Sequence, residues 1–155
     1  MNVYRIAKKK YIKDLSGEGA CFYGGRWNYS GYQVLYASES IPLAILEYIT
    51  KTGAVEEELI NLSIAYIEVK DDVSFSTIKI EDLPEDWNIY PVPEDLKKIG
   101  TDWIISAQSL ILKVPAVSAP DSYNILINPV HSEFKKVNLL KISGYQPALR
   151  LRKKK

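Results

Sequence analysis

Residues 24–48 constrain the fold more than any other part of the chain, because they specify three elements in immediate succession. A glycine pair opens the segment, and glycine permits positive φ and a close approach of a ligand to the backbone. Residues 34–37 form a short apolar run typical of a strand. The following segment has Pro42 in its first turn and Gly53 after its end, which predicts a helix over residues 41–52. The sequence therefore predicts a turn, a strand and a returning helix.

The rest of the chain predicts mostly short strands separated by turns. Strands are expected at residues 3–7, 62–69, 110–114, 124–127 and 137–142, with short extended segments at 73–75 and 77–80. Residues 11–15 are a turn of helix or extended chain, residues 93–99 a short helix ended by Gly100, and residues 103–109 helical or irregular. This pattern favours the α+β class, as a single compact domain over residues 1–155 with mixed or antiparallel sheets.

Composition excludes several classes of protein. The chain is 46% hydrophobic and 25% charged with a net charge of +1, so no general attraction to nucleic acid or membrane is expected. One cysteine, Cys21, precludes an internal disulfide. Because the chain has only this cysteine and one histidine, a zinc site or another metal site is not expected. No apolar run could span a bilayer and no signal-peptide core is present, so we expect a cytoplasmic protein. The basic tail from about residue 150 is expected to be a solvated end.

Three unlike side chains fall within the opening segment. Arg26 offers a planar fork of donors suited to phosphate, Tyr36 an aromatic face at a strand end, and Glu47 an acid two turns into an otherwise apolar helix. Taken one at a time, each has an ordinary interpretation as a turn arginine, a core tyrosine and a solvated glutamate. Their combination indicates a binding site but does not by itself define a reaction.

The order of these motifs resembles the RES domain family. The motifs that carry this resemblance are GGRWN, the strand VLYAS, the helix with LAILE, GTDW, LKVP and the late NILINPVH. Tyr4-Arg5-Ile6 is similar to the family's opening strand. The resemblance runs from Val3 to about Leu140. Where the family commonly has VPS, this chain has Ala116. Ser118 is the candidate substitute for the missing hydroxyl, and Ser109 is a weaker one.

The resemblance implies an ADP-ribosyltransferase-like fold and the toxin of a bacterial toxin–antitoxin pair, with a cognate Xre-type antitoxin as partner. It implies NAD+ as substrate, with no prosthetic cofactor. The nicotinamide–ribose bond would be cleaved by hydrolysis, by phosphorolysis with inorganic phosphate, or by ADP-ribosyl transfer to a protein. In this interpretation Arg26 binds the pyrophosphate, Tyr36 stacks on nicotinamide and Glu47 stabilises the ribosyl cation. The absent serine leaves open a third possibility, a non-catalytic binding module.

Five further residues are candidates for substrate binding: Arg5, Gly25, Ser118, Asn128 and His131. Three of them also have an ordinary structural interpretation. Arg5 could lie on a solvent face, Asn128 could belong to the turn before Pro129, and His131 could be a capping or surface histidine.

Overall fold

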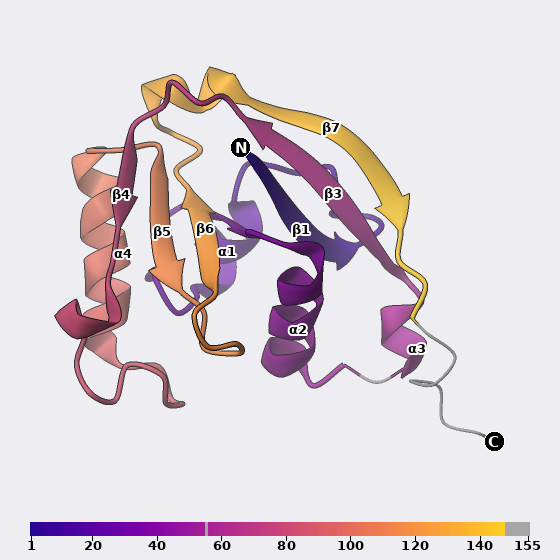
Figure 1. Cartoon of the computed structure of the whole chain (residues 1–155), viewed down its shortest axis with the longest axis horizontal. Helices are drawn as coiled ribbons and strands as arrows, with labels where there is room; N and C mark the ends of the chain where they lie inside the picture. The colour runs from indigo at the N-terminus through magenta and orange to yellow at the C-terminus, as the bar shows by residue number, and fades with distance from the viewer. Residues whose placement is uncertain (55, 148–155) are drawn as a thin grey trace.

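Seven strands form one mixed sheet in the order β4-β5-β6-β2-β1-β3-β7 (Figure 1). The computed structural model describes residues 1–54 and 56–147, so the basic tail expected from about residue 150 lies outside the described residues. Only β4 and β5 pair in parallel, and the other neighbours are antiparallel. The strands are β1 Asn2–Lys8, β2 Leu35–Ser38, β3 Leu62–Val69, β4 Phe75–Thr77, β5 Ile111–Pro115, β6 Tyr123–Ile127 and β7 Val137–Gly144.

Within residues 1–54 and 56–147, four helices and two 3-10 turns connect these strands. They are α1 Glu18–Tyr23, α2 Ile41–Thr52, α3 Glu56–Leu59, α4 Glu94–Ser106, η1 Ile80–Asp82 and η2 Ser132–Lys136. In α2 the Ser40 hydroxyl accepts a hydrogen bond from Leu43 N, and Gly53 closes the helix with φ 62°. Because α2 packs against β1 and β2, its inner face lies over the centre of the sheet.

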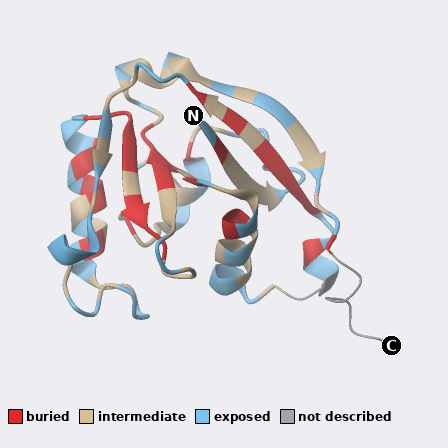
Figure 2. Ribbon diagram, in the orientation of Figure 1, coloured by how far each residue is buried: buried red, intermediate tan, exposed pale blue. Residues whose placement is uncertain are grey.

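Among the described residues, two apolar clusters hold the sheet and helices together. Figure 2 shows the buried residues along β3, β5 and β6 and on one side of α4. The larger cluster draws on strands from both halves of the sheet, including Val3, Leu35, Ile67 and Ile125. The second cluster packs α4 against the other side of β5 and β6 and includes Trp27, Leu96, Trp103, Leu112 and Leu126. Alternate residues of β5 and β6 therefore serve different clusters, as the pleat of a strand requires. Trp27 ties the glycine-rich loop into the second cluster.

The expected fold class and most expected elements are confirmed. Helix α2 and strand β3 have the predicted bounds, and the other predicted strands are present with ends shifted by one or two residues. The segments at 73–75 and 77–80 are replaced by β4 and η1, and residues 11–15 lie in turns and irregular chain. Helix α1 was not predicted. No helix within residues 1–54 and 56–147 is long and apolar enough to cross a membrane.

One expectation about a helix end was wrong. Gly100 does not end the helix begun near residue 93, because α4 continues to Ser106 and ends at Ala107 with φ 49°. A Cβ at position 100 would lie 1.8 Å from the Trp27 carbonyl oxygen. Gly100 is therefore a contact point where the helix touches the loop that follows Arg26, and its missing side chain makes that approach possible.

Candidate active site

A cavity of about 400 Å³ lies between α2, the loop after Gly24 and the ends of β5 and β6. Its volume is within the usual range for sites that bind small molecules. Segments distant in sequence line it: Arg26 and Trp27, Tyr36, Glu47 with Thr50 and Lys51, Asn88 with Tyr90 and Val92, Pro115 with Val117 and Ser118, and Asn124. The three residues singled out as catalytic candidates therefore meet at one cavity.

Asn28 organises the loop that carries Arg26. Its side chain is completely buried, and its Nδ2 lies 2.9, 3.0 and 3.2 Å from the carbonyl oxygens of Ala20, Tyr29 and Tyr32. Its Oδ1 accepts a hydrogen bond of 2.7 Å from the Tyr36 hydroxyl. A single amide side chain thus connects α1, both sides of the loop and β2. Sequence reasoning did not identify this residue, although Asn28 belongs to the GGRWN motif.

Tyr36 has two roles in this arrangement. Its hydroxyl donates to Asn28 and accepts a 3.2 Å hydrogen bond from the backbone N–H of Trp27. Burial raises the pKa of Tyr36, so the hydroxyl remains protonated at neutral pH and keeps its donor role. The residue also lines the cavity. Tyr36 therefore fixes the loop through its hydroxyl while its side chain forms part of the cavity wall.

Gly25 is packed against that hydroxyl. A Cβ at Gly25 would lie 2.6 Å from the Tyr36 hydroxyl oxygen and 3.0 Å from Asn28 Oδ1. Only Gly24 of the pair has a positive φ, at 70°. Gly25 pairs instead in an isolated β-bridge with Asn28 and does not line the cavity. Its lack of a side chain makes room for Tyr36, so Gly25 affects the site through the position of Tyr36 and without lining the cavity.

Arg26 projects from this loop to the cavity and to the segment facing it. Its Nη1 donates to the carbonyl oxygens of Trp87 and Ile89, at 3.0 and 3.2 Å. Burial lowers the pKa of Arg26, and the nearby Glu47 opposes that effect, so the guanidinium retains its charge. Within residues 1–54 and 56–147 its other nitrogens form no hydrogen bond with the protein. They remain available to an anionic ligand.

Glu47 and Ser118 meet at the wall of the cavity. The Glu47 Oε1 accepts a 3.3 Å hydrogen bond from the backbone N–H of Ser118, which fixes the carboxylate to the turn after β5. The Ser118 hydroxyl is buried and has no hydrogen-bond partner within the described residues. Because a buried hydroxyl without a partner costs free energy, a ligand that pairs with it would gain affinity. Ala116, at the position of the expected serine, is buried and lines a different pocket.

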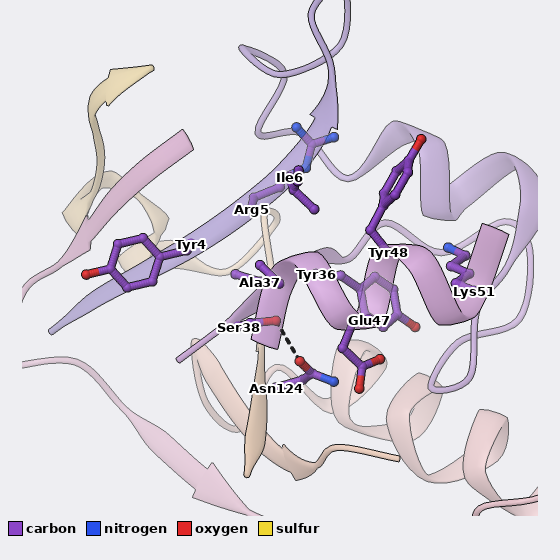
Figure 3. A pocket seen from close by; sticks show the side chains of 11 residues that line it. Tyr4, Arg5, Ile6, Tyr36, Ala37, Ser38, Glu47, Tyr48, Lys51 and Asn124 are labelled. Carbon is purple, nitrogen blue, oxygen red and sulfur yellow. Dashed lines mark hydrogen bonds between the residues drawn. The ribbon is translucent and has the colours of Figure 1, made fainter. Parts of the chain in front are cut away.

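A smaller pocket of about 150 Å³ continues past Glu47 (Figure 3). Tyr36, Glu47, Lys51 and Asn124 line both spaces. In Figure 3 Glu47 projects from α2 into the space between Tyr36 and Asn124. Asn124 Oδ1 accepts a 2.7 Å hydrogen bond from the Ser38 hydroxyl, so its amide group is held in place from β2. Sequence reasoning missed Asn124, although a polar residue at the start of an apolar strand is a usable signal.

Arg5 borders only the smaller pocket. Its Nη1 donates to the carbonyl oxygens of Tyr11 and Ile12, at 3.1 and 3.2 Å, and its guanidinium points away from Glu47 in Figure 3. Burial lowers the pKa of Arg5, and Asp14 opposes that effect. These contacts make Arg5 an anchor for the turn after β1.

Asn128 and His131 follow the end of β6 that is opposite to Asn124, and they line none of these three pockets: the cavity, the smaller pocket and the pocket at Ala116. Asn128 is completely buried, donating to the Ile104 carbonyl and accepting from Val130 N. His131 Nδ1 accepts a hydrogen bond from Glu133 N at the start of η2. The structure therefore separates both residues from Arg26 and Glu47, and their contacts are those of turn and cap residues.

Comparisons with known proteins agree with the family resemblance. A family model described as "RES domain" matches residues 2–150. "Toxin Res" from Yersinia enterocolitica is 35% identical over 138 residues, covering 86% of this chain and 88% of that protein. "Prs ADP-ribosylating toxin" from Sphingobium sp. is 36% identical over 131 residues, covering 83% and 81%.

A solved structure resembles this fold over nearly its whole length. The crystal structure of the M. tuberculosis MbcT–MbcA toxin–antitoxin complex contains a chain that superposes with a TM-score of 0.78 at 20% identity, covering 96% of this chain and 85% of that one. This likeness confirms the expected α+β fold.

Proposed function

The chain belongs to the RES domain family of toxins, and we propose that it cleaves the bond between nicotinamide and ribose in NAD+. The carrying observation is the convergence of Arg26, Tyr36 and Glu47 on one cavity of small-molecule size. A cation, an aromatic residue and a carboxylate suit the pyrophosphate, the nicotinamide ring and the ribosyl cation of this reaction. The name of the Sphingobium relative, an ADP-ribosylating toxin, supports NAD+ as the substrate.

The reaction separates charge in a defined way. The bond between the ribose C1 atom and the nicotinamide nitrogen breaks, and its electron pair leaves with the ring, which becomes neutral. Positive charge then develops on the ribose. A carboxylate held beside the ribose stabilises the transition state more than the substrate, which is the condition for catalysis. Glu47, oriented by the Ser118 N–H, has this role in our proposal.

The other residues hold the substrate. The guanidinium nitrogens of Arg26 that have no partner among the described residues suit the pyrophosphate, because a guanidinium can donate two parallel hydrogen bonds to phosphate oxygens. Tyr36 offers a wall for the nicotinamide ring. The Asn124 amide, at the cavity wall, is a polar group suited to the ribose or the carboxamide. Ser118 also lines the cavity, and its buried hydroxyl has no partner within the described residues. In hydrolysis a water molecule attacks the ribosyl cation and loses a proton. In phosphorolysis inorganic phosphate attacks instead.

ADP-ribosyl transfer to a protein is the second candidate. The name of the Sphingobium relative favours this outcome, and the bond that breaks is the same. Only the nucleophile differs, since a protein side chain replaces water or phosphate. The solved toxin–antitoxin complex with this fold also supports our proposal that a cognate antitoxin of the Xre type binds this chain.

Mass spectrometry of the purified protein with NAD+, with and without inorganic phosphate, tests the proposal. Free ADP-ribose indicates hydrolysis, ADP-ribose 1″-phosphate indicates phosphorolysis, and a labelled protein in a bacterial lysate indicates transfer. We expect Glu47→Gln to lower the rate on the order of 10²–10³-fold, because it removes the charge but keeps the shape. Glu57→Gln, at an exposed helix position, is the matched control. Absence of every product, or full activity of folded Glu47→Gln, would refute the proposal.

A further inference from the structure

A third pocket, of about 250 Å³, adjoins the cavity, and Glu47 does not line it. It is bounded by η1 and the chain that follows, and by the turn between β5 and β6. Asn88, Pro115 and Val117 line both spaces, whereas Glu47 and Tyr36 line the cavity and the smallest pocket. The cavity therefore lies between the smallest pocket and the third pocket. The proposed site of bond cleavage, at Glu47, is where the cavity meets the smallest pocket.

Arg26 lines the cavity and contacts a residue that lines the third pocket. Its Nη1 donates to the carbonyl oxygen of Trp87, and Trp87 lines the third pocket. A pyrophosphate bound at Arg26 would therefore have the reacting ribose on its Glu47 side and a second nucleoside on its Trp87 side. The alternative space for that nucleoside, past Glu47, is only about 150 Å³.

The lining of the third pocket suits a base and its sugar. Its walls include the apolar side chain of Ile80, which is half exposed, together with Trp87, Pro120 and Tyr123. Asp121 adds a carboxylate, and it is exposed. Asp121 also has φ 55°, which places it at a left-handed position in the turn. A carboxylate accepts hydrogen bonds from two neighbouring hydroxyl groups, and a ribose presents such a pair.

We propose that the third pocket binds the adenosine end of NAD+, with its base against the apolar walls and its ribose hydroxyls donating to Asp121. This inference rests on the proposed function and extends it to specificity. A phosphate on the 2′-hydroxyl would meet the negative charge of Asp121, and like charges at short range repel. The protein should therefore prefer NAD+ to NADP+.

Three substrates separate the contributions of the pocket. Nicotinamide mononucleotide contains the bond to be cleaved but lacks adenosine, NAD+ has both, and NADP+ carries the extra phosphate. Asp121→Asn removes the charge that strengthens these hydrogen bonds, so it should lower kcat/KM for NAD+ by about tenfold. It should leave kcat/KM for nicotinamide mononucleotide unchanged and should reduce the preference for NAD+ over NADP+. Asp95→Asn, exposed on α4, is the matched control.

Binding of AMP provides a readout that does not depend on turnover. Calorimetry should show AMP binding to the native protein and weaker binding to Asp121→Asn. If neither NAD+ nor nicotinamide mononucleotide is cleaved but AMP binding still depends on Asp121, the proposed function fails and the adenosine site stands. If Asp121→Asn lowers cleavage of NAD+ and nicotinamide mononucleotide equally, or changes neither substrate, the adenosine site is refuted while the proposed function stands.

Discussion

Gly25→Ala tests how the site depends on the packing of Gly25 against Tyr36, which lines the cavity. The added Cβ would lie 2.6 Å from the Tyr36 hydroxyl oxygen, whereas ordinary contact begins at 3.4 Å, so the hydroxyl must move by about 0.8 Å. The φ of Gly25 is not in the positive range, so alanine meets no backbone penalty there. Any effect must therefore come from the contact with Tyr36 and, at 3.0 Å, with Asn28 Oδ1.

Two magnitudes follow from that displacement. Overpacking of this kind costs about 1–3 kcal/mol, which for a chain of this length corresponds to a fall in Tm of about 2–12 °C. A misplacement of about 1 Å at a reacting centre can lower the rate on the order of 10²-fold. Because the Tyr36 hydroxyl holds both the Trp27 N–H and Asn28, we expect Arg26 to be displaced along with the aromatic wall.

The assay compares Gly25→Ala with Gly19→Ala. The second variant makes the same chemical change in α1, where a Cβ meets nothing within 4 Å, and should be neutral or slightly stabilising. Tm and kcat/KM for NAD+ are measured for both, with nicotinamide release as the readout. If Gly25→Ala keeps the native Tm and turnover, the loop does not depend on its contact with Tyr36, and our account of how Arg26 is positioned is wrong.

Three other predictions concern a ligand contact, a packing contact and an acidic group. Calorimetry in a catalytically inactive background should show weaker NAD+ binding for Arg26→Lys and weaker still for Arg26→Ala, because lysine keeps the charge but loses the planar pair of donors. Equal affinity of both variants and of the protein that keeps Arg26 would remove Arg26 from the site. Gly100→Ala, with its Cβ 1.8 Å from the Trp27 carbonyl, should lower stability by about 3 kcal/mol or more, and a native melting curve would contradict that close approach. Hydrogen bonds from the Ser74 hydroxyl and N–H lower the pKa of Glu133, so their stabilisation is complete above the ordinary glutamate pKa and is lost as the pH falls through the lowered value. Glu133→Gln should therefore flatten the decrease in stability below about pH 4, and an unaltered acid profile in urea titrations would refute this assignment.

The sequence by itself determined the local elements that carry their own signals. Helix α2 has the predicted bounds because Ser40, Pro42 and Gly53 act through local backbone geometry. Strand β3 follows from eight residues of strand-forming pattern. The order of Arg26, Tyr36 and Glu47 identified the family, and the structure brings these three residues to one cavity.

Tertiary structure decided what depends on residues far apart in the chain. A glycine at position 100 is typical of a helix end, but here a glycine is needed because the Trp27 carbonyl, 73 positions earlier, leaves no room for a side chain. The hydrogen bonds of Asn28 and the unpaired hydroxyl of Ser118 depend on the surrounding packing, so no local pattern reveals them. Asn128 and His131 show the converse, since they follow Asn124 closely in sequence yet lie beyond the opposite end of β6. A strand extends by about 3.3 Å per residue, so four to seven positions are enough to carry a side chain out of the site.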